Sequence, residues 1–190
     1  MAIRKSLNGN NARADILTAA SRLFIEQGGE STSLKDIARA CNLSTGTLYY
    51  YYASKSDLIF DVTDAYFDDL THRLLDWVSQ SYQQNDPEKI LQVVFERITG
   101  DLLRGKLHHY LVQAAVSSEP ATRERFQQKY TEWRKMIDSG LVHFIQDDEE
   151  RGLTAHIILA TLDGLVLQAI LGIDDIPIQA ISAHLAKNLK

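Results

Sequence analysis

Apolar residues recur at spacings of three and four along nearly the whole 190-residue chain, and only three prolines interrupt the pattern. This spacing matches the 3.6-residue turn of an α-helix, whereas the strict alternation typical of strands is scarce. With 45% hydrophobic residues, a chain of this length can bury a substantial core. We therefore predict an all-α protein of about nine helices.

Capping residues divide the pattern into separate helices. A first helix over about 11–27 ends at Gly28-Gly29, where glycine can take the left-handed cap conformation. Ser33, in a capping box with Asp36, begins a short helix over 34–41, and Ser44 caps another over 45–51. The remaining helices are predicted over about 55–81, 87–98, 107–116, 120–146 and 153–171, and from about 177 onward.

The two short helices, joined by a tight turn and braced by the first helix, form a predicted helix-turn-helix. Leu48 and Tyr52 lie four residues apart on one face of the second short helix, so we expect them to pack inward against Ile37. Four consecutive tyrosines, residues 49–52, cannot all be buried at 100° steps. An exposed aromatic surface on a short helix indicates a binding partner, and DNA fits it.

The distribution of charge agrees with this prediction. Residues 1–57 carry seven lysines or arginines against five acidic residues, whereas the remainder carries thirteen basic and twenty acidic residues. A polyanion would therefore meet the N-terminal part of the chain. Lys55 would bind phosphate, and Arg4 and Lys5 form a basic arm that would follow the DNA backbone or enter a minor groove.

The same stretches resemble the DNA-binding domain of the TetR family, through residues 16–24, 32–38 and 44–55. The resemblance implies a helix-turn-helix domain over 1–54 and a helical effector-binding and dimerisation domain over 55–190. It also implies a homodimeric transcriptional regulator, usually a repressor, that responds to a small molecule. A dimer with two DNA-reading heads would bind a palindromic operator.

We predict DNA contacts from the exposed and capping positions of this motif: Ser33, Thr45, Gly46, Thr47, Tyr49, Tyr50, Tyr51 and Lys55. The resemblance places Tyr49 and Lys55 on phosphates and the residues around them at or near the groove. Position 52 is usually phenylalanine in the family, so the Tyr52 hydroxyl needs a partner or solvent. Gly29 stands where the family often has an aromatic residue.

The last two long helices carry more apolar surface than one core face can use. We therefore predict a dimer interface formed by Ile157, Gly164, Leu165, Gln168, Leu171, Ile181 and Leu185. The alternatives are that the helix over 153–171 is fully internal to one subunit, and that Gly164 serves packing within the subunit.

Candidate effector contacts are polar or aromatic residues that helical periodicity brings near the core: Phe67, Trp77, His109, Gln113, Tyr130, Trp133 and Gln168. The alternative is that they are core aromatic residues, or polar residues whose hydrogen bonds are made within the chain. The pattern identifies no particular effector.

Catalytic and metal-binding motifs are not found in the sequence. It has no GxSxG elbow, no HExxH and no phosphate-binding glycine loop, so we expect no enzyme and no cofactor. The single cysteine, Cys41, excludes an internal disulfide and any zinc site of several thiolates. His108 and His109 point 100° apart, and Asp68 with His72 lacks a third ligand. The acidic run over 147–150 is predicted as a solvated loop.

No uninterrupted apolar run approaches a membrane span and residues 1–10 lack a secretory signal, so we expect a cytoplasmic protein without a membrane partner. Two alternatives to regulation remain open. One is a DNA-binding protein of the same fold with an architectural or cell-division role. The other is a ligand-binding protein that has lost DNA binding, which the intact stretch 45–55 opposes.

Overall fold

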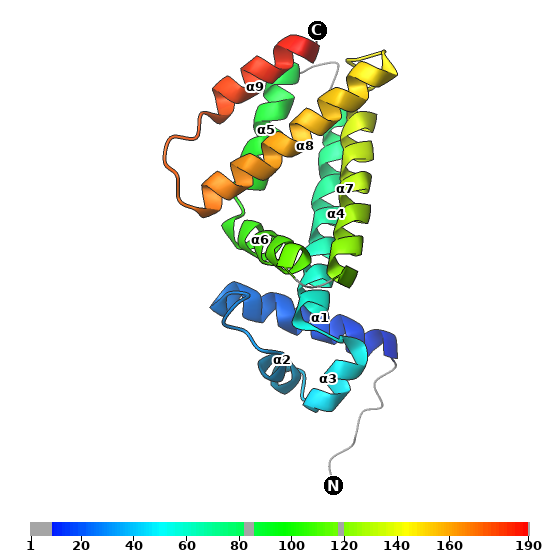
Figure 1. Cartoon of the computed structure of the whole chain (residues 1–190), viewed down its shortest axis with the longest axis vertical. Helices are drawn as coiled ribbons and strands as arrows, with labels where there is room; N and C mark the ends of the chain where they lie inside the picture. Colours follow the sequence, from blue (N-terminus) through cyan, green and yellow to red (C-terminus); the bar gives the residue numbers. More distant parts are fainter. Residues whose placement is uncertain (1–8, 82–85, 118–119, 190) are drawn as a thin grey trace. The chain divides into compact units, whose positions relative to one another are not determined.

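The computed structural model describes residues 9–81, 86–117 and 120–189 and is helical throughout these ranges (Figure 1). The helices are α1 (Gly9–Gln27), α2 (Leu34–Ala40), α3 (Thr45–Tyr51), α4 (Lys55–Ser81), α5 (Pro87–Thr99), α6 (Leu102–Ser117), α7 (Pro120–Leu141), α8 (Asp148–Ile170) and α9 (Ile178–Ala186), followed by a short 3-10 turn, Lys187–Leu189. The prediction of an all-α protein with nine helices is confirmed for the described residues.

The chain divides into two compact units, Met1–Tyr66 and Phe67–Lys190. The division falls inside α4, so the first turns of this helix belong to the N-terminal unit. Leu58 and Ile59, on these turns, are fully buried. The sequence placed the domain boundary earlier, between residues 54 and 55, and as an assignment of functional domains that boundary stays a prediction.

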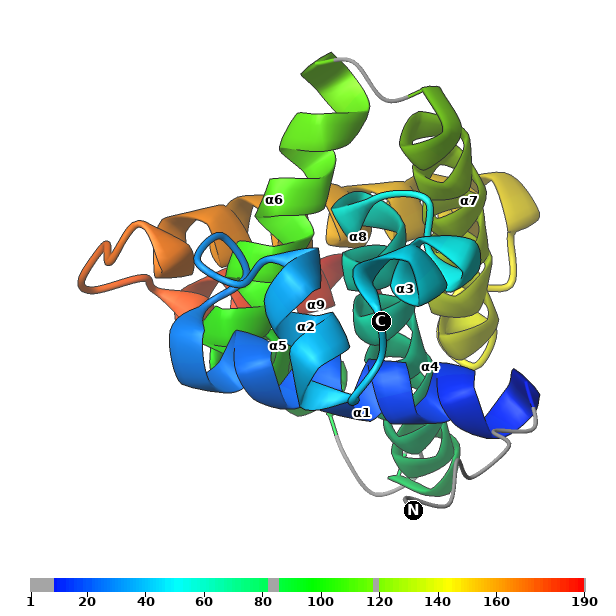
Figure 2. The ribbon, with the colours of Figure 1, turned by 90° about the horizontal axis from the view of Figure 1, so that it is seen from below.

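The N-terminal unit is built on a small apolar core from its helices. Ile16 and Phe24 of α1, Ile37 of α2 and Leu48 of α3 are all fully buried. Helices α2 and α3 pack side by side, as Figure 2 shows. After α1, Gly28 takes a φ of 83°, so the predicted left-handed cap is confirmed.

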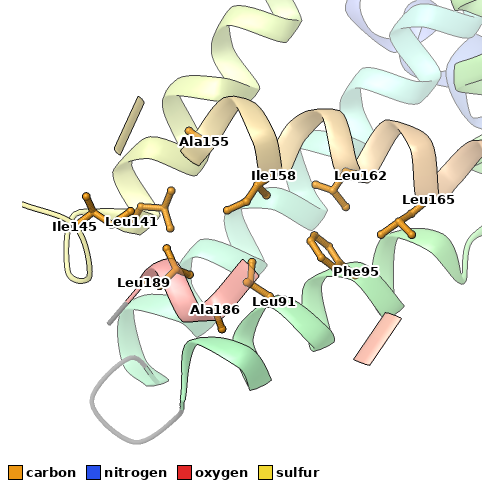
Figure 3. Packing of buried hydrophobic residues seen from close by; sticks show 10 residues of the cluster. All are labelled: Leu91, Phe95, Leu141, Ile145, Ala155, Ile158, Leu162, Leu165, Ala186 and Leu189. Atoms are coloured by element: carbon orange, nitrogen blue, oxygen red, sulfur yellow. The ribbon is translucent and has the colours of Figure 1, made fainter. Parts of the chain in front are cut away.

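The C-terminal unit has its own core, at which α5, α8 and α9 meet (Figure 3). Its members are Leu91, Phe95, Leu141, Ile145, Ala155, Ile158, Leu162, Leu165, Ala186 and Leu189. Helices α5 and α8 contribute residues three or four positions apart, such as Ile158, Leu162 and Leu165 of α8. The periodicity seen in the sequence is therefore the periodicity of this core.

Two helix starts differ from the sequence prediction because an aspartate caps each helix earlier. Helix α6 begins at Leu102 instead of 107, where the Asp101 carboxylate accepts the backbone N–H of Arg104 at 3.1 Å. The acidic run 147–150, predicted as a loop, begins α8 instead. Asp147 accepts the N–H of Glu150 at 2.8 Å, and acidic residues in a first turn favour the helix dipole. Helix α7 ends at Leu141, earlier than predicted.

Helix α8 is long and apolar enough, by length and composition, to meet a simple criterion for a membrane-crossing helix. Core helices of water-soluble folds also meet that criterion, so it is weak evidence of a membrane. The helix carries Asp163 near its centre, which interrupts the apolar run. The criterion shows that α8 presents a large amount of apolar surface.

Candidate nucleic-acid interface and ligand cavity

The start of α3 is fixed by its cap and by the turn before it. The Ser44 hydroxyl accepts the backbone N–H of Thr47 at 3.0 Å. Asn42 takes a φ of 55°, and the N–H of Leu43 closes the turn onto the carbonyl of Ala38 at 2.8 Å. This turn joins α2 and α3 in the helix-turn-helix arrangement that the sequence predicts.

Helix α3 has one buried face and one exposed face, as predicted. Leu48 is fully buried and Tyr52 is 2% exposed, whereas Tyr49 is 53% and Tyr50 85% exposed. Thr45, Gly46 and Thr47 are also exposed. Tyr51, which we expected to face outward, is half-buried, and its ring lies edge-on to that of Tyr50 at 5.4 Å between centroids.

Gly46 is not required by packing within the chain. A Cβ atom built at this position would meet the Ser44 hydroxyl at 3.8 Å, which is an ordinary van der Waals contact. The absence of a side chain therefore leaves room for something outside the chain. This agrees with the prediction that another backbone approaches α3 closely at this point.

The Tyr52 hydroxyl, which the sequence left without an obvious partner, is bound by Arg13 of α1. The Arg13 Nε donates to this hydroxyl at 3.3 Å, and the guanidinium lies 5.5 Å from the ring centroid. Arg13 also forms an ion pair with Asp61 of α4. Burial raises the pKa of Tyr52, so the hydroxyl stays protonated at neutral pH. One cluster thus joins α1, the end of α3 and α4.

Two of the predicted DNA contacts also have roles within the chain. Ser33 caps α2, because its hydroxyl accepts the N–H of Asp36 at 3.2 Å. The Lys55 amino group donates to the carbonyl of Glu30 at 3.0 Å, which ties the segment after α1 to the start of α4. Burial lowers the pKa of Lys55, with Glu30 opposing the shift. A phosphate contact by Lys55 stays a prediction.

A cavity of about 190 Å³ lies within the C-terminal unit. Its walls are mostly aliphatic side chains from four helices, and its lining also includes residues that carry charge or an imidazole. The lining comprises Pro87, Ile90, Leu91, Val94, Ile98, Asp101, Arg104, Gly105, His108, Trp133, Met136, Ile137, Gly140, Leu141, Phe144, Ile158, Leu159, Leu162, Asp163, Val166 and Leu189. Apolar pockets with a few polar groups are typical small-molecule sites.

The polar groups of the cavity are paired within the chain. Arg104 and Asp101 form an ion pair at 2.7 Å between Nη1 and Oδ2. The Tyr130 hydroxyl donates to Oδ2 of Asp163 at 3.0 Å, and burial raises the pKa of Asp163. Because these charges are paired or shifted toward neutrality, the cavity can remain apolar around them.

His108 lies in an aromatic cluster beside the cavity. Its ring centroid is 5.5 Å from that of Phe126, 5.8 Å from Trp133 and 6.4 Å from Tyr130. Burial, with a smaller contribution from the neighbouring His109, lowers the pKa of His108 to about 4. The imidazole is therefore neutral at pH 7.

The structure brings only part of the predicted effector site together. Trp133 lines the cavity. Tyr130 does not line it, but its hydroxyl donates a hydrogen bond to the lining residue Asp163. His109, Gln113 and Gln168 are exposed and, like Trp77, do not line the cavity. The side chain of Phe67 lies outside the described residues.

The sequence analysis missed Arg104, His108 and Asp163 as lining residues. The signal was available in part, because Asp101, Arg104 and His108 follow the i, i+3, i+7 spacing of one helix face. The helix predicted from the sequence begins only at 107, so Asp101 and Arg104 lie outside it. Among the described residues, no cluster of three potential metal ligands is present.

The predicted dimer residues do not all share one surface. Ile157 is 45% and Leu171 66% exposed, and Gln168 is also exposed. Leu165, in contrast, is 2% exposed and lies in the core of its own unit, so it is unsuited to contact a partner. Ile181 and Leu185 pack against the same core while remaining half-buried. A Cβ at Gly164 would meet nothing within 4 Å, so packing inside the chain does not require glycine there.

Family sequence profiles match both parts of the chain. Residues 16–62 match the profile of bacterial regulatory proteins of the tetR family, and residues 111–190 match that of the C-terminal part of BetI-type transcriptional repressors. The chain belongs to the TetR family. Both profiles are those of transcriptional regulators with a helix-turn-helix domain, and the family resemblance seen in the sequence is confirmed.

Similar proteins agree with this membership of the TetR family. The transcriptional repressor KstR2 of Mycobacterium tuberculosis is 26% identical over 124 residues, 64% of this chain and 57% of that protein. The regulator TtgR of Pseudomonas putida is 26% identical over 87% of this chain and 83% of its own length. The structure of GusR from Salmonella enterica has a TM-score of 0.68 at 22% identity, covering 98% of this chain and 99% of that one. The chain thus spans little more than half the length of KstR2.

The buried imidazole generates a prediction about acid stability. Free histidine has a pKa of about 6.5, so between pH 6.5 and 4 the unfolded chain takes up a proton that native His108 does not. The proton linkage of His108 therefore costs no stability above pH 6.5. Below pH 6.5 it lowers the free energy of unfolding by up to about 1.4 kcal/mol per pH unit. We expect His108→Gln to flatten this fall, as measured by urea denaturation at pH 7, 6 and 5.

The matched control for this prediction is His109→Gln, one residue along the same helix and exposed to solvent. We expect it to keep most of the acid sensitivity of the natural chain. If the two variants lost stability with equal slope, the neutral imidazole at position 108 would not be the source of the effect.

Proposed function

We propose that this TetR-family regulator is a ligand-responsive repressor that binds a palindromic operator as a homodimer in the cytoplasm, without catalysing a reaction. The observation that carries the proposal is the exposed outer face of α3, where Tyr50 is 85% exposed at the second helix of a helix-turn-helix. Phenol hydroxyls donate to phosphates, and their rings contact thymine methyl groups in the major groove. Gly46 leaves space for the DNA to approach the helix.

The proposed dimer rests on the apolar surface of α8. Of the most apolar 18-residue stretch of this helix, 22% is buried within the chain. The exposed side chains of Leu153, Ile157 and Leu171 would cost about 25 cal/mol for each Å² left in water. Burial against a second copy removes this cost, and the open space at Gly164 would let a partner helix approach closely.

Ligand response is supported by the cavity of the C-terminal unit. A mostly apolar space of about 190 Å³ with a few paired polar groups is suited to a small molecule. A purely architectural DNA-binding protein has no need of such a space, so the cavity favours regulation. We infer that a ligand there changes the affinity for the operator.

The first test removes Tyr50 of the outer face together with the half-buried Tyr51 beside it. We expect Tyr50→Ala with Tyr51→Ala to abolish specific DNA binding, measured by fluorescence anisotropy on sites selected from a random DNA pool. Because Tyr50 makes few contacts within the chain, circular dichroism should show an unchanged helix content. Tyr110→Ala on α6 is the control and should keep its affinity. Unchanged operator affinity in the double variant would show that α3 is not the reading helix.

The second test concerns Lys55 and the phosphate backbone. We expect Lys55→Ala to weaken binding to all DNA sequences alike and to reduce the slope of log affinity against log salt by about one. Lys106→Ala, which removes an exposed lysine from α6, should leave the slope unchanged. An unaltered slope in Lys55→Ala would show that this amino group does not neutralise a phosphate.

The third test concerns the dimer. We expect Ile157→Asp to yield monomers in sedimentation velocity, because an aspartate in an apolar interface would be desolvated without a partner. Leu102→Asp is the matched control, since Leu102 is 49% exposed and Ile157 45% exposed. A dimer that survives Ile157→Asp, or a natural chain that is monomeric, would refute an interface on this face of α8.

A further inference from the structure

The cavity of the C-terminal unit is elongated along its lining helices. On α5 the lining runs from Pro87 to Ile98, a rise of eleven residues or about 16 Å along the helix axis. On α7 it runs from Trp133 to Leu141, a rise of about 12 Å, and Phe144 follows the end of this helix. A volume of about 190 Å³ spread over such a length describes a narrow space and not a round one.

The two ends of this space differ in chemistry. At one end lie Pro87 at the start of α5, Phe144 after α7 and Leu189 after α9, all of them apolar. At the other end lie Ile98 and residues of α6, including Arg104 and His108. The cavity is therefore apolar at the first end, whereas polar groups are placed at the second.

Helix α6 lies at the polar end, where a glycine allows it to pack directly on α8. A Cβ atom at Gly105 would lie 2.7 Å from Cγ2 of Ile170 and 3.2 Å from Cγ1 of Val166, both closer than such atoms pack. Gly105 and Val166 also line the cavity. This helix crossing therefore forms part of the wall at the polar end.

The side walls between the two ends are aliphatic and adaptable. Val94, Met136, Ile137 and Leu162 face the space between its ends. Branched aliphatic side chains with a methionine provide van der Waals contacts along a chain, and methionine adjusts to irregular shapes. Among the described lining residues, the aromatic rings of Trp133 and Phe144 stand on either side of this aliphatic stretch of α7 and not within it.

We infer that the cavity takes one unbranched aliphatic chain of medium length, with the polar end of the ligand at α6 and its tail toward Leu189. The inference deepens the proposed function, since it names the class of effector for the site proposed above. Shape carries it: the space is long, narrow and aliphatic, with polar groups at one end.

The test uses neutral probes, so that the charged pairs of the cavity do not decide the outcome. Isothermal titration calorimetry of the full chain with 1-alkanols from hexanol to tetradecanol should show affinity rising about fourfold per methylene, then levelling off once the space is filled. Decan-1-ol and 1-adamantanol each have ten carbon atoms, one as a chain and the other as a compact cage. We expect the chain to bind at least tenfold more tightly.

A matched pair of variants assigns the binding to this space. Val94→Phe adds a ring to the lining and should weaken decan-1-ol binding at least tenfold and move the levelling-off to shorter alcohols. Val93→Phe makes the same change at the neighbouring half-buried valine, which is not part of the lining. It should change the affinity less than twofold. Equal effects of the two variants would place the binding elsewhere.

Other outcomes overturn the inference directly, because the probe series on the natural chain does not depend on any variant folding. Equal or tighter binding of 1-adamantanol would show a compact site, and no binding of any alcohol would show a space that stays empty. DNA binding is measured separately by fluorescence anisotropy without any alcohol. If the natural chain binds its operator but no alkanol, the effector class is wrong and the DNA-binding proposal stands; the reverse result refutes only the latter.

Discussion

The burial of Leu48 and Tyr52 decides what the N-terminal unit can do. Leu48 lies on the inner face of the seven-residue helix α3 and Tyr52 directly follows its end, so their burial leaves Tyr49 and Tyr50 on the exposed side. The Arg13 contact then satisfies the one polar atom that this burial removes from water. A helix this short would be marginal alone, so its packing and its serine cap hold the outer face in place.

The sequence was informative where a local pattern alone determines the structure. The serine caps at Ser33 and Ser44, the glycine after α1 and the inward face of α3 all follow from neighbours within a few residues. The acidic run before α8 was misread because acidic residues serve equally as a solvated loop and as a first helical turn. The Asp147 cap decides between the two structures, and only the fold shows that it is used.

The cavity could not be derived in the same way, because its lining comes from helices far apart in the sequence. Periodicity indicates that His108 and Asp163 each lie on a particular helix face, but not which helix that face meets. Trp133 lies in the lining and the partly buried Trp77 does not, because periodicity places both near the core without showing which space each one faces. Whether either residue contacts an effector stays a prediction. Leu165 was placed at a dimer interface for being apolar on an apolar helix, whereas the chain's own core uses it.

The energetics of that cavity bear on why it exists. An apolar space forgoes the van der Waals contacts that larger side chains would make there, so it contributes less stability than a filled core. A domain needed only to hold two DNA-reading units together would be more stable with larger side chains in that place. A ligand that binds only the folded state returns stability in proportion to its concentration. A small molecule that fills this space can therefore supply the free energy for a change of conformation, provided that the operator-bound and operator-free states differ in affinity for it.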